Sequence, residues 1–279
     1  MSTPHASLGT WIDGVAGTHV PVDDRGLQYG DGLFETMLVR DGTARFLAAH
    51  LGRLARGCSR LGIPYDDEAA RADVSRALAA APALAIVKLL VTRGSAARRG
   101  YAPQPGTPRR VLTLFAASDT RSMAPGVTLG VTLGVARTRA ATSPALAGLK
   151  TLNRLENVLA AAEIAGGDQD VLMLDHADRI VSGSSSNVFV AKDGRLVTPK
   201  LDSAGVAGVL RGIVQREAPK LGLVVQERAI TLADLAAADE VFITNARIGI
   251  VPVSRVGEHA FRSFELALRL RGHIEALDA

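Results

Sequence analysis

The chain has 279 residues, 47% of them hydrophobic and 22% charged, which is typical of a globular protein with one large domain or two ordinary ones. Its net charge is only +4 and its basic residues are spread without a block, so nucleic acid is not expected as the main partner. No apolar stretch reaches the roughly 20 residues that cross a bilayer and no export signal is evident, so we expect a cytoplasmic protein without a membrane partner.

The first part of the chain predicts a mixture of strands and two helices. Short strands joined by Asp-Gly turns are expected over residues 10–42. A helix is expected over 45–63, where apolar side chains recur at positions 47, 51, 54, 58 and 61. A second helix with an acidic start is expected over 66–81. Two strands rich in β-branched residues, over 84–94 and 109–118, complete this part.

A polar segment with Pro-Gly punctuation, residues 118–126, predicts a boundary between two domains, residues 1–118 and 126–279. In the second domain, strands are expected over 127–138, 170–175, 179–199 and 238–256, and helices over 151–165, 205–219 and 261–277. This interleaving favours an α/β or α+β fold for both domains.

The five lysines of the chain differ in their surroundings. Three of them lie in turns or at a helix C-terminus, where a solvated charge is expected: Lys192, Lys200 and Lys220. Lys88 lies inside the apolar strand AIVKLLV, where it is expected to snorkel or to pair. Lys150 ends a loop of small residues and precedes a helix that Thr151 is expected to cap. Spacing alone leaves open whether Lys150 is solvated or reactive.

Six segments of the chain carry a family resemblance. They are YGDGLFET at 29–36, HLGRL at 50–54, TRGSAARRGY at 92–101, GLKTLNRLENVLA at 148–160, SGSSSNVF at 182–189 and GVAGVLR at 205–211. In this order they resemble the class IV aminotransferase family, the fold-type IV enzymes that depend on pyridoxal phosphate. The resemblance implies a smaller N-terminal two-layer α/β domain and a larger C-terminal α/β domain with a barrel-like sheet. It further implies a cofactor in the cleft between the domains, a small-molecule substrate and a homodimer.

The resemblance also implies which residues bind the cofactor. Lys150 matches the lysine that bonds to the cofactor aldehyde, and Arg53 matches the arginine that grips its phosphate. Val209 and Leu210 match residues whose backbone amides bind the phosphate. A helix N-terminus suits this role because it offers free N–H groups and the positive end of the helix dipole. The remaining cofactor-binding candidates are Ser182, Ser186, Asn187, Asn245 and Ala246.

A second set of residues matches the substrate-binding positions of the family. Arg98, Arg99 and Tyr101 fall where a substrate carboxylate is gripped, and a planar guanidinium suits a carboxylate. The two arginines compete for this role, and Arg99 is favoured. Glu35 and Thr36 match a strand that lines the cleft, with their roles left open.

One position departs from the family pattern. Ser182 stands where the family usually has a glutamate that pairs with the pyridine nitrogen of the cofactor. Either another acid substitutes, with Asp178 and Glu156 as candidates, or the ring withdraws electrons less strongly. Transamination is expected to suffer most from this change, whereas an elimination driven by aromatisation tolerates it better.

Within the family, the segments GDGLFET, RGY and GLKTLNRLEN are most similar to the aminodeoxychorismate lyases. This similarity implies a carbon–oxygen lyase that gives 4-aminobenzoate and pyruvate in folate biosynthesis. Two alternatives stay open: an aminotransferase acting on D-amino or branched-chain amino acids, and a family member that binds a ligand without catalysis. No His/Cys spacing predicts a metal site.

Overall fold

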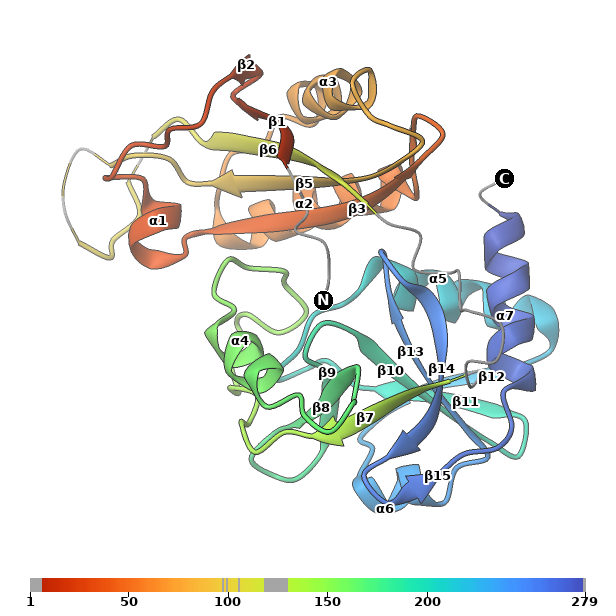
Figure 1. The fold of residues 1–279 in the computed structure, drawn as a ribbon. Coiled ribbons are helices and arrows are strands. Elements are labelled where there is room, and N and C mark those ends of the chain that lie inside the picture. Colours follow the sequence, from red (N-terminus) through yellow and green to blue (C-terminus); the bar gives the residue numbers. More distant parts are fainter. Residues whose placement is uncertain (1–6, 97, 99, 105, 118–129, 278–279) are drawn as a thin grey trace. The chain divides into compact units, whose positions relative to one another are not determined.

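The computed structural model describes residues 7–96, 98, 100–104, 106–117 and 130–277. The chain divides into two compact units (Figure 1). Unit 1 comprises Met1–Thr120 together with Lys150–Asn153, and unit 2 comprises Arg121–Leu149 and Arg154–Ala279. The expected boundary segment, 118–126, lies outside the described residues. The short segment Lys150–Asn153 therefore belongs to unit 1, although the residues before and after it in the sequence belong to unit 2.

Unit 1 is built on a six-stranded antiparallel sheet in the order β2-β1-β6-β5-β3-β4. Its strands are β1 (Ser7–Ile12), β2 (Val15–Ala16), β3 (Gly32–Arg40), β4 (Thr43–Ala44), β5 (Leu84–Thr92) and β6 (Arg109–Ala116). The hairpin turns Asp13–Gly14 and Asp41–Gly42 have positive φ at both residues. Two-residue hairpins of type I′ require this conformation, so the expected Asp-Gly turns are confirmed.

Three helices accompany the sheet of unit 1: α1 (Arg25–Tyr29), α2 (Leu47–Leu61) and α3 (Asp67–Leu78). Helix α2 packs on β3, and α3 packs on β5 and β6 (Figure 1). The stripe Leu51, Leu54 and Cys58 of α2 is fully buried, as its helical period predicts. Gly57 of α2 allows close packing, because a Cβ there would lie 2.9 Å from the side chain of Leu33 on β3. The odd-numbered residues of β3 therefore face α2.

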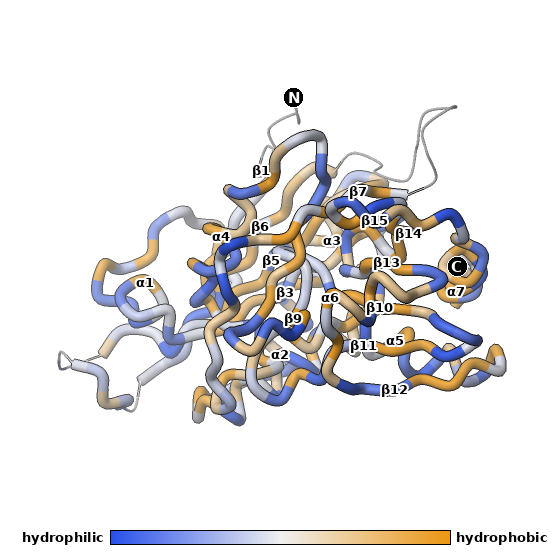
Figure 2. The backbone as a smooth tube through the Cα atoms, turned by 90° about the horizontal axis from the view of Figure 1, so that it is seen from below, coloured by the Kyte–Doolittle hydropathy of each residue, from blue (hydrophilic) through white to orange (hydrophobic). Residues whose placement is uncertain are grey.

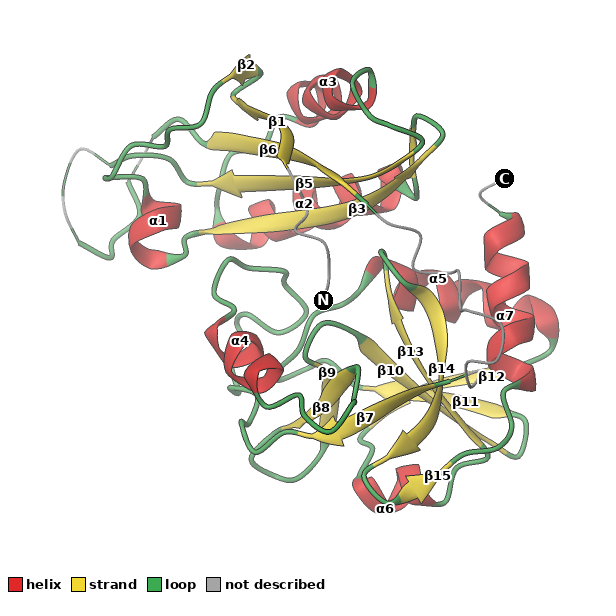
Figure 3. Cartoon of the chain, in the orientation of Figure 1, coloured by secondary structure: helices red, strands yellow, loops and turns green. Residues whose placement is uncertain are grey.

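Unit 2 contains a nine-stranded mixed sheet in the order β12-β11-β10-β13-β14-β7-β8-β9, with β15 paired to β14 (Figure 3). Its strands are β7 (Val131–Val135), β8 (Asp170–Leu174), β9 (Ile180–Gly183), β10 (Asn187–Lys192), β11 (Arg195–Pro199), β12 (Val224–Arg228), β13 (Glu240–Asn245), β14 (Gly249–Val256) and β15 (His259–Ala260). Strand β9 ends the order yet lies against β10 and β11, so the sheet curls back on itself. The expected fold class, with a barrel-like sheet in the larger unit, is confirmed.

The helices of unit 2 are α4 (Leu155–Ala162), α5 (Val209–Glu217), the 3₁₀ helix η1 (Ala218–Leu221), α6 (Leu232–Ala236) and α7 (Glu265–Ala276). Helix α4 packs on β8, while α5 and α7 pack on β13 and on each other. Strands β10 and β13 consist largely of apolar residues (Figure 2). Phe189 and Phe242, on these two strands, are fully buried with their rings stacked 5.0 Å apart. Such a pair adds about 1 kcal/mol beyond burial alone.

The helix expected over 151–165 begins four residues later, at Leu155. Residues 150–152 instead run beside β3: Phe34 N donates to Lys150 O, and Leu152 N donates to Gly32 O. Thr151 forms an isolated bridge with Leu33, so its expected role as helix cap is wrong. Pairing with β3 satisfies backbone groups that would otherwise need a helical turn, and this long-range pairing overrides the local capping signal.

Candidate active site

Lys150 lies over an aromatic ring of the strand beside it. Its Nζ is 4.1 Å from the centroid of the Phe34 ring, and Nζ of Lys88 on β5 is 5.4 Å from the same centroid. A cation gains electrostatic energy over an aromatic face. Phe34 is an even-numbered residue of β3, so both lysines lie on the side of the sheet that faces away from α2. The structure thus brings Lys88 and Lys150 to the same aromatic ring, an arrangement that no local sequence pattern predicts.

Arg53 is held by a buried carboxylate on β3. Its Nε donates to Oε1 of Glu35 at 2.7 Å and its Nη2 donates to Oε2, while Nδ1 of His50 lies 2.6 Å from Oε2. Glu35 is only 1% exposed. Burial by itself would raise the pKa of Glu35, but the hydrogen bonds and charges of His50 and Arg53 outweigh it and lower this pKa. An ionised Glu35 therefore fixes the guanidinium of Arg53.

The two β3 residues that were expected to bind substrate point to opposite faces. Glu35 faces α2 and both of its oxygens are engaged by His50 and Arg53. Thr36 is half-buried, shares the face of Phe34 and is paired in register with Lys88. Thr36 is therefore the member of the pair that lies on the same face as Lys150.

The candidate substrate grip lies on the loop between β5 and β6. Arg98 is exposed; its backbone N donates to Oε1 of Gln104 at 3.2 Å. The ring of Tyr101 meets the ring of Tyr29 edge to face, with centroids 5.4 Å apart. Arg99, the favoured arginine, lies outside the described residues. Arg98 and Tyr101 thus present polar groups at the surface of unit 1.

In unit 2, two serines of the SGSSSN segment donate hydrogen bonds to a buried acid that the sequence did not reveal. Asp170, at the start of β8, is 3% exposed and accepts hydrogen bonds from the hydroxyls of Ser184 and Ser186 at 2.5 and 2.8 Å. The signal was an acid opening the otherwise apolar strand DVLML. Ser182 is also buried, and its hydroxyl donates to the carbonyl of Gly183.

The two acids proposed to replace the missing glutamate are both engaged elsewhere in unit 2. The side chain of Asp178 is 75% exposed and pairs with Arg139 at 2.7 Å. Glu156 accepts a hydrogen bond from the backbone N of Ala141 at 2.6 Å. Their partners make either acid a weak candidate for pairing with the cofactor ring.

Most of the cofactor-binding candidates of unit 2, Ser182 excepted, lie around the start of one helix. Helix α5 begins at Val209, and its N-cap residue, Gly208, makes no side-chain cap. A Cβ on Gly208 would lie 2.0 Å from Oδ1 of Asn187, so the helix start packs tightly against β10. Asn187 in turn pairs with Thr244 of β13, next to Asn245. An uncapped helix start of this kind offers N–H groups and a positive dipole end to a phosphate.

A turn on β13 completes this region. Oδ1 of Asn245 accepts from the backbone N of Arg247 and Ile248 at 2.9 Å, and its Nδ2 donates to Ser185 O at 3.2 Å. Ala246 lies inside the turn so formed. Ser186, Asn187, Val209, Leu210, Asn245 and Ala246 are therefore brought together within unit 2.

Two other kinds of site are absent from the part of the chain that the structure describes. No group of three or more His, Cys, Asp or Glu side chains there could hold a metal ion. Among the described helices, none combines the length and apolar character that crossing a membrane requires.

Comparison with known proteins yields matches along most of the chain. The family model for amino-transferase class IV matches residues 32–256. Aminodeoxychorismate lyase of Vibrio harveyi is 35% identical over 269 residues, which is 95% of this chain and 98% of that protein. The crystal structure of 4-amino-4-deoxychorismate lyase from Pseudomonas aeruginosa has a TM-score of 0.88 at 44% identity and covers 97% of this chain and 100% of its own. D-alanine aminotransferase of Listeria monocytogenes is 31% identical over 85% of this chain and 82% of that protein.

Proposed function

The chain belongs to the class IV aminotransferase family, and from this premise we propose that it is a pyridoxal-phosphate-dependent 4-amino-4-deoxychorismate lyase. The observation that carries the proposal is similarity to two such lyases along almost the whole chain, at 35% and 44% identity. The products are 4-aminobenzoate, a folate precursor, and pyruvate. The cytoplasmic location expected from the sequence stays a prediction.

The residues present suit pyridoxal phosphate. The cofactor, when bound, supplies an aldehyde that bonds to amines and a ring that withdraws electrons. Lys150 is the amine proposed to hold the aldehyde. Arg53, fixed by Glu35, and the uncapped start of α5 at Val209 and Leu210 are the groups proposed for the phosphate. Ser182, Ser186, Asn187, Asn245 and Ala246 are proposed to complete the cofactor-binding set.

In the proposed reaction the chain moves one proton and holds one carboxylate. Nζ of Lys150 takes the proton from C4 of the substrate as general base. The bond between C3 and the ether oxygen then breaks, and the departing enolpyruvate takes up a proton to become pyruvate. The ring that remains is aromatic, which makes the step strongly downhill. Arg98 or Arg99, with Tyr101, binds a substrate carboxylate, and Thr36 lies on the strand face of Lys150.

The proposal is tested by supplying aminodeoxychorismate to the purified, cofactor-loaded protein. We expect 4-aminobenzoate and pyruvate in equal amounts, measured by fluorescence and by a coupled lactate dehydrogenase assay. A protein that forms neither product but transfers an amino group between an amino acid and a keto acid would be an aminotransferase. A protein that does neither would be the non-catalytic ligand-binding member of the family.

The aminotransferase alternative is supported by the similarity to D-alanine aminotransferase, and Ser182 separates the two activities. The Ser182→Glu variant places a carboxylate where it can hold a proton on the ring nitrogen, which the serine hydroxyl cannot do. We expect this variant to raise transamination between D-alanine and a keto acid several-fold, measured as new amino acid by chromatography. The matched control is Ser182→Gln, which has the same size without the charge. Equal rates in both variants would contradict the role assigned to position 182.

The proposed enzyme is a homodimer. Helix α4 exposes an apolar face, with Leu155 78%, Val158 60% and Leu159 59% exposed. A contiguous apolar face of this kind favours contact with another protein surface. We expect the double variant Leu155→Glu/Leu159→Glu to elute as a monomer in size-exclusion chromatography with light scattering, whereas Leu268→Glu, at a 38% exposed leucine of α7, stays dimeric. A monomeric wild type, or a double variant that remains dimeric, would refute this assignment.

A further inference from the structure

We propose that Arg25 is a positioning residue that fixes the Gly100–Tyr101 backbone and thereby sets the affinity for the substrate carboxylate. Arg25 is 4% exposed, and it lies in α1, a helix absent from the sequence-based expectations. This inference rests on the proposed function, because Tyr101 belongs to the candidate substrate grip. Arg25 itself touches neither substrate nor cofactor in this scheme and acts only through the backbone.

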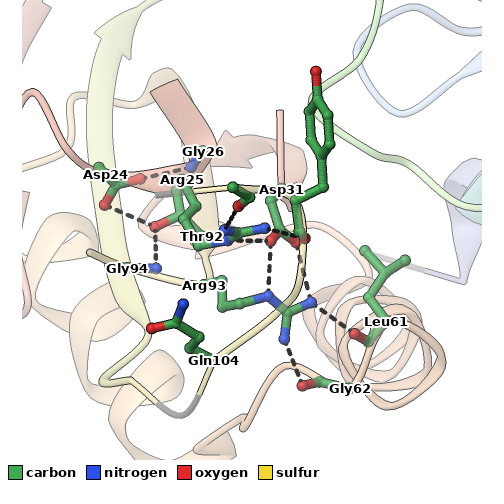
Figure 4. A network of polar contacts seen from close by, with 12 residues as sticks. Asp24, Arg25, Gly26, Asp31, Leu61, Gly62, Thr92, Arg93, Gly94 and Gln104 are labelled. Carbon is green, nitrogen blue, oxygen red and sulfur yellow. Dashed lines mark hydrogen bonds and ion pairs between the residues drawn. The ribbon is translucent and has the colours of Figure 1, made fainter. Parts of the chain in front are cut away.

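All three nitrogen atoms of the Arg25 guanidinium donate hydrogen bonds. Nη1 donates to the carbonyl of Gly100 at 2.8 Å, and Nη2 donates to the carbonyl of Tyr101 at 2.9 Å. Nε donates to Oδ2 of Asp31 at 2.8 Å (Figure 4). The planar group also lies 4.9 Å from the centroid of the Tyr29 ring. Two bonds to successive carbonyls from one rigid plane fix the peptide between them, and with it the direction in which the Tyr101 side chain leaves the backbone.

Asp31 ties Arg25 to the body of unit 1. Its Oδ2 also accepts from Nε of Arg93 at 2.7 Å, and Arg93 donates to the carbonyls of Leu61 and Gly62 at the end of α2 (Figure 4). Burial would raise the pKa of Asp31, but the hydrogen bonds from Arg93 and Arg25 outweigh it, so this pKa is lowered. A charged Asp31 thus anchors both arginines to the helix that carries Arg53.

The hydrogen bonds from Arg25 to the carbonyls of Gly100 and Tyr101 lie in a loop that little else holds. Their loss is therefore expected to affect this loop more than the stability of unit 1. The segment 100–104 has no strand or helix of its own, and the side chain of Tyr101 is 86% exposed. Packing therefore contributes little to the position of Tyr101. Its edge-to-face contact with Tyr29 is weaker than the two charge-assisted hydrogen bonds that Arg25 donates to the backbone of Gly100 and Tyr101. Tyr29 belongs to the same short helix as Arg25, so α1 holds both the backbone and the ring of residue 101.

The test compares the cofactor-loaded full chain with its Arg25→Leu and Arg25→Lys variants. We expect Arg25→Leu to raise KM for aminodeoxychorismate about 10- to 100-fold while kcat stays within about 3-fold, because substrate binding loses its preformed grip. Arg25→Lys keeps the positive charge but loses the planar guanidinium. Its KM is therefore expected to lie between that of the wild type and that of Arg25→Leu. The matched control is Arg110→Leu, which breaks the 2.6 Å ion pair with Asp73 in the same unit and is expected to leave KM unchanged.

A second readout does not depend on turnover. Hydrogen–deuterium exchange of the peptide spanning residues 100–108 is expected to quicken in Arg25→Leu and to stay as in the wild type in Arg110→Leu. An unchanged KM and unchanged exchange in Arg25→Leu overturn the proposal, and so does an equal loss of kcat in both leucine variants. Should Arg25→Leu fail to fold, Arg25→Lys decides by the same two measurements. If the wild type forms no 4-aminobenzoate, the proposed function fails, and the exchange data alone decide whether Arg25 holds the loop.

Discussion

Replacing Lys150 by alanine is expected to abolish formation of 4-aminobenzoate, with kcat falling at least about 10³-fold. The variant loses both the amine that holds the cofactor aldehyde and the base that takes the C4 proton, so no other side chain compensates. Steady-state assays with aminodeoxychorismate measure the loss. Mass spectrometry after borohydride reduction measures the covalent link, which the wild type should show on the peptide containing Lys150.

Lys88 provides the matched control for this experiment. Its Nζ lies over the same Phe34 ring as that of Lys150, at 5.4 Å against 4.1 Å from the centroid. Lys88→Ala removes the same kind of side chain from the same face of the sheet but leaves the proposed attachment point intact. We expect it to keep the borohydride-stable link. Retention of activity in Lys150→Ala, or a link that maps to Lys88, would overturn the assignment of Lys150.

Replacing Arg53 by leucine is expected to have two separable effects. Breaking a buried ion pair leaves Glu35 with His50 but without Arg53, so the free energy of unfolding should fall by about 3 kcal/mol, near the lower end for such losses because His50 still lies against Glu35. The affinity for pyridoxal phosphate should fall about 10- to 100-fold, since one charged hydrogen-bonding group is lost from the phosphate. Urea unfolding of the cofactor-free protein measures the first effect, and titration with the cofactor measures the second.

A double variant separates the two effects of Arg53. Arg53→Leu/Glu35→Leu also removes the stranded carboxylate, so stability should recover while cofactor affinity stays low. Recovery of both quantities would show that Arg53 acts on the fold alone. The pH dependence gives a further check. Because the pKa of Glu35 is lowered in the folded protein, the pair stabilises the fold above its ordinary value of 4.5, and this contribution is lost as the pH falls through the lowered pKa. The acid-side loss should therefore be smaller in the double variant.

Features that depend on a few neighbouring residues were predictable from the sequence. The Asp-Gly hairpins follow from the conformational needs of a two-residue turn, and the buried face of α2 follows from the spacing of Leu51, Leu54 and Cys58. The family resemblance identified the residues around the start of α5, which the structure does bring together within unit 2.

Features that depend on distant partners were not predictable in this way. Thr151 looked like a helix cap because its neighbours are helix formers, but its backbone neighbours pair with β3 more than a hundred residues earlier. The partner of Arg53 was missed for the same reason, since only the packing of α2 on β3 brings Glu35 to it. Helix α1 is five residues long, too short for a hydrophobic period, so no local pattern indicated a role for Arg25.

Strand β3 carries two kinds of chemistry on opposite sides: Glu35 towards α2, and Phe34 beneath Lys150. Its side chains alternate with a period of two, so a single inserted or deleted residue within the strand would invert every one downstream of it. Such a shift introduced before Phe34 would carry Glu35 to the side of the sheet where Lys150 lies and Phe34 to the side where Arg53 lies. Length variation is therefore expected to be tolerated in the hairpin at Asp41–Gly42 but not within the strand itself.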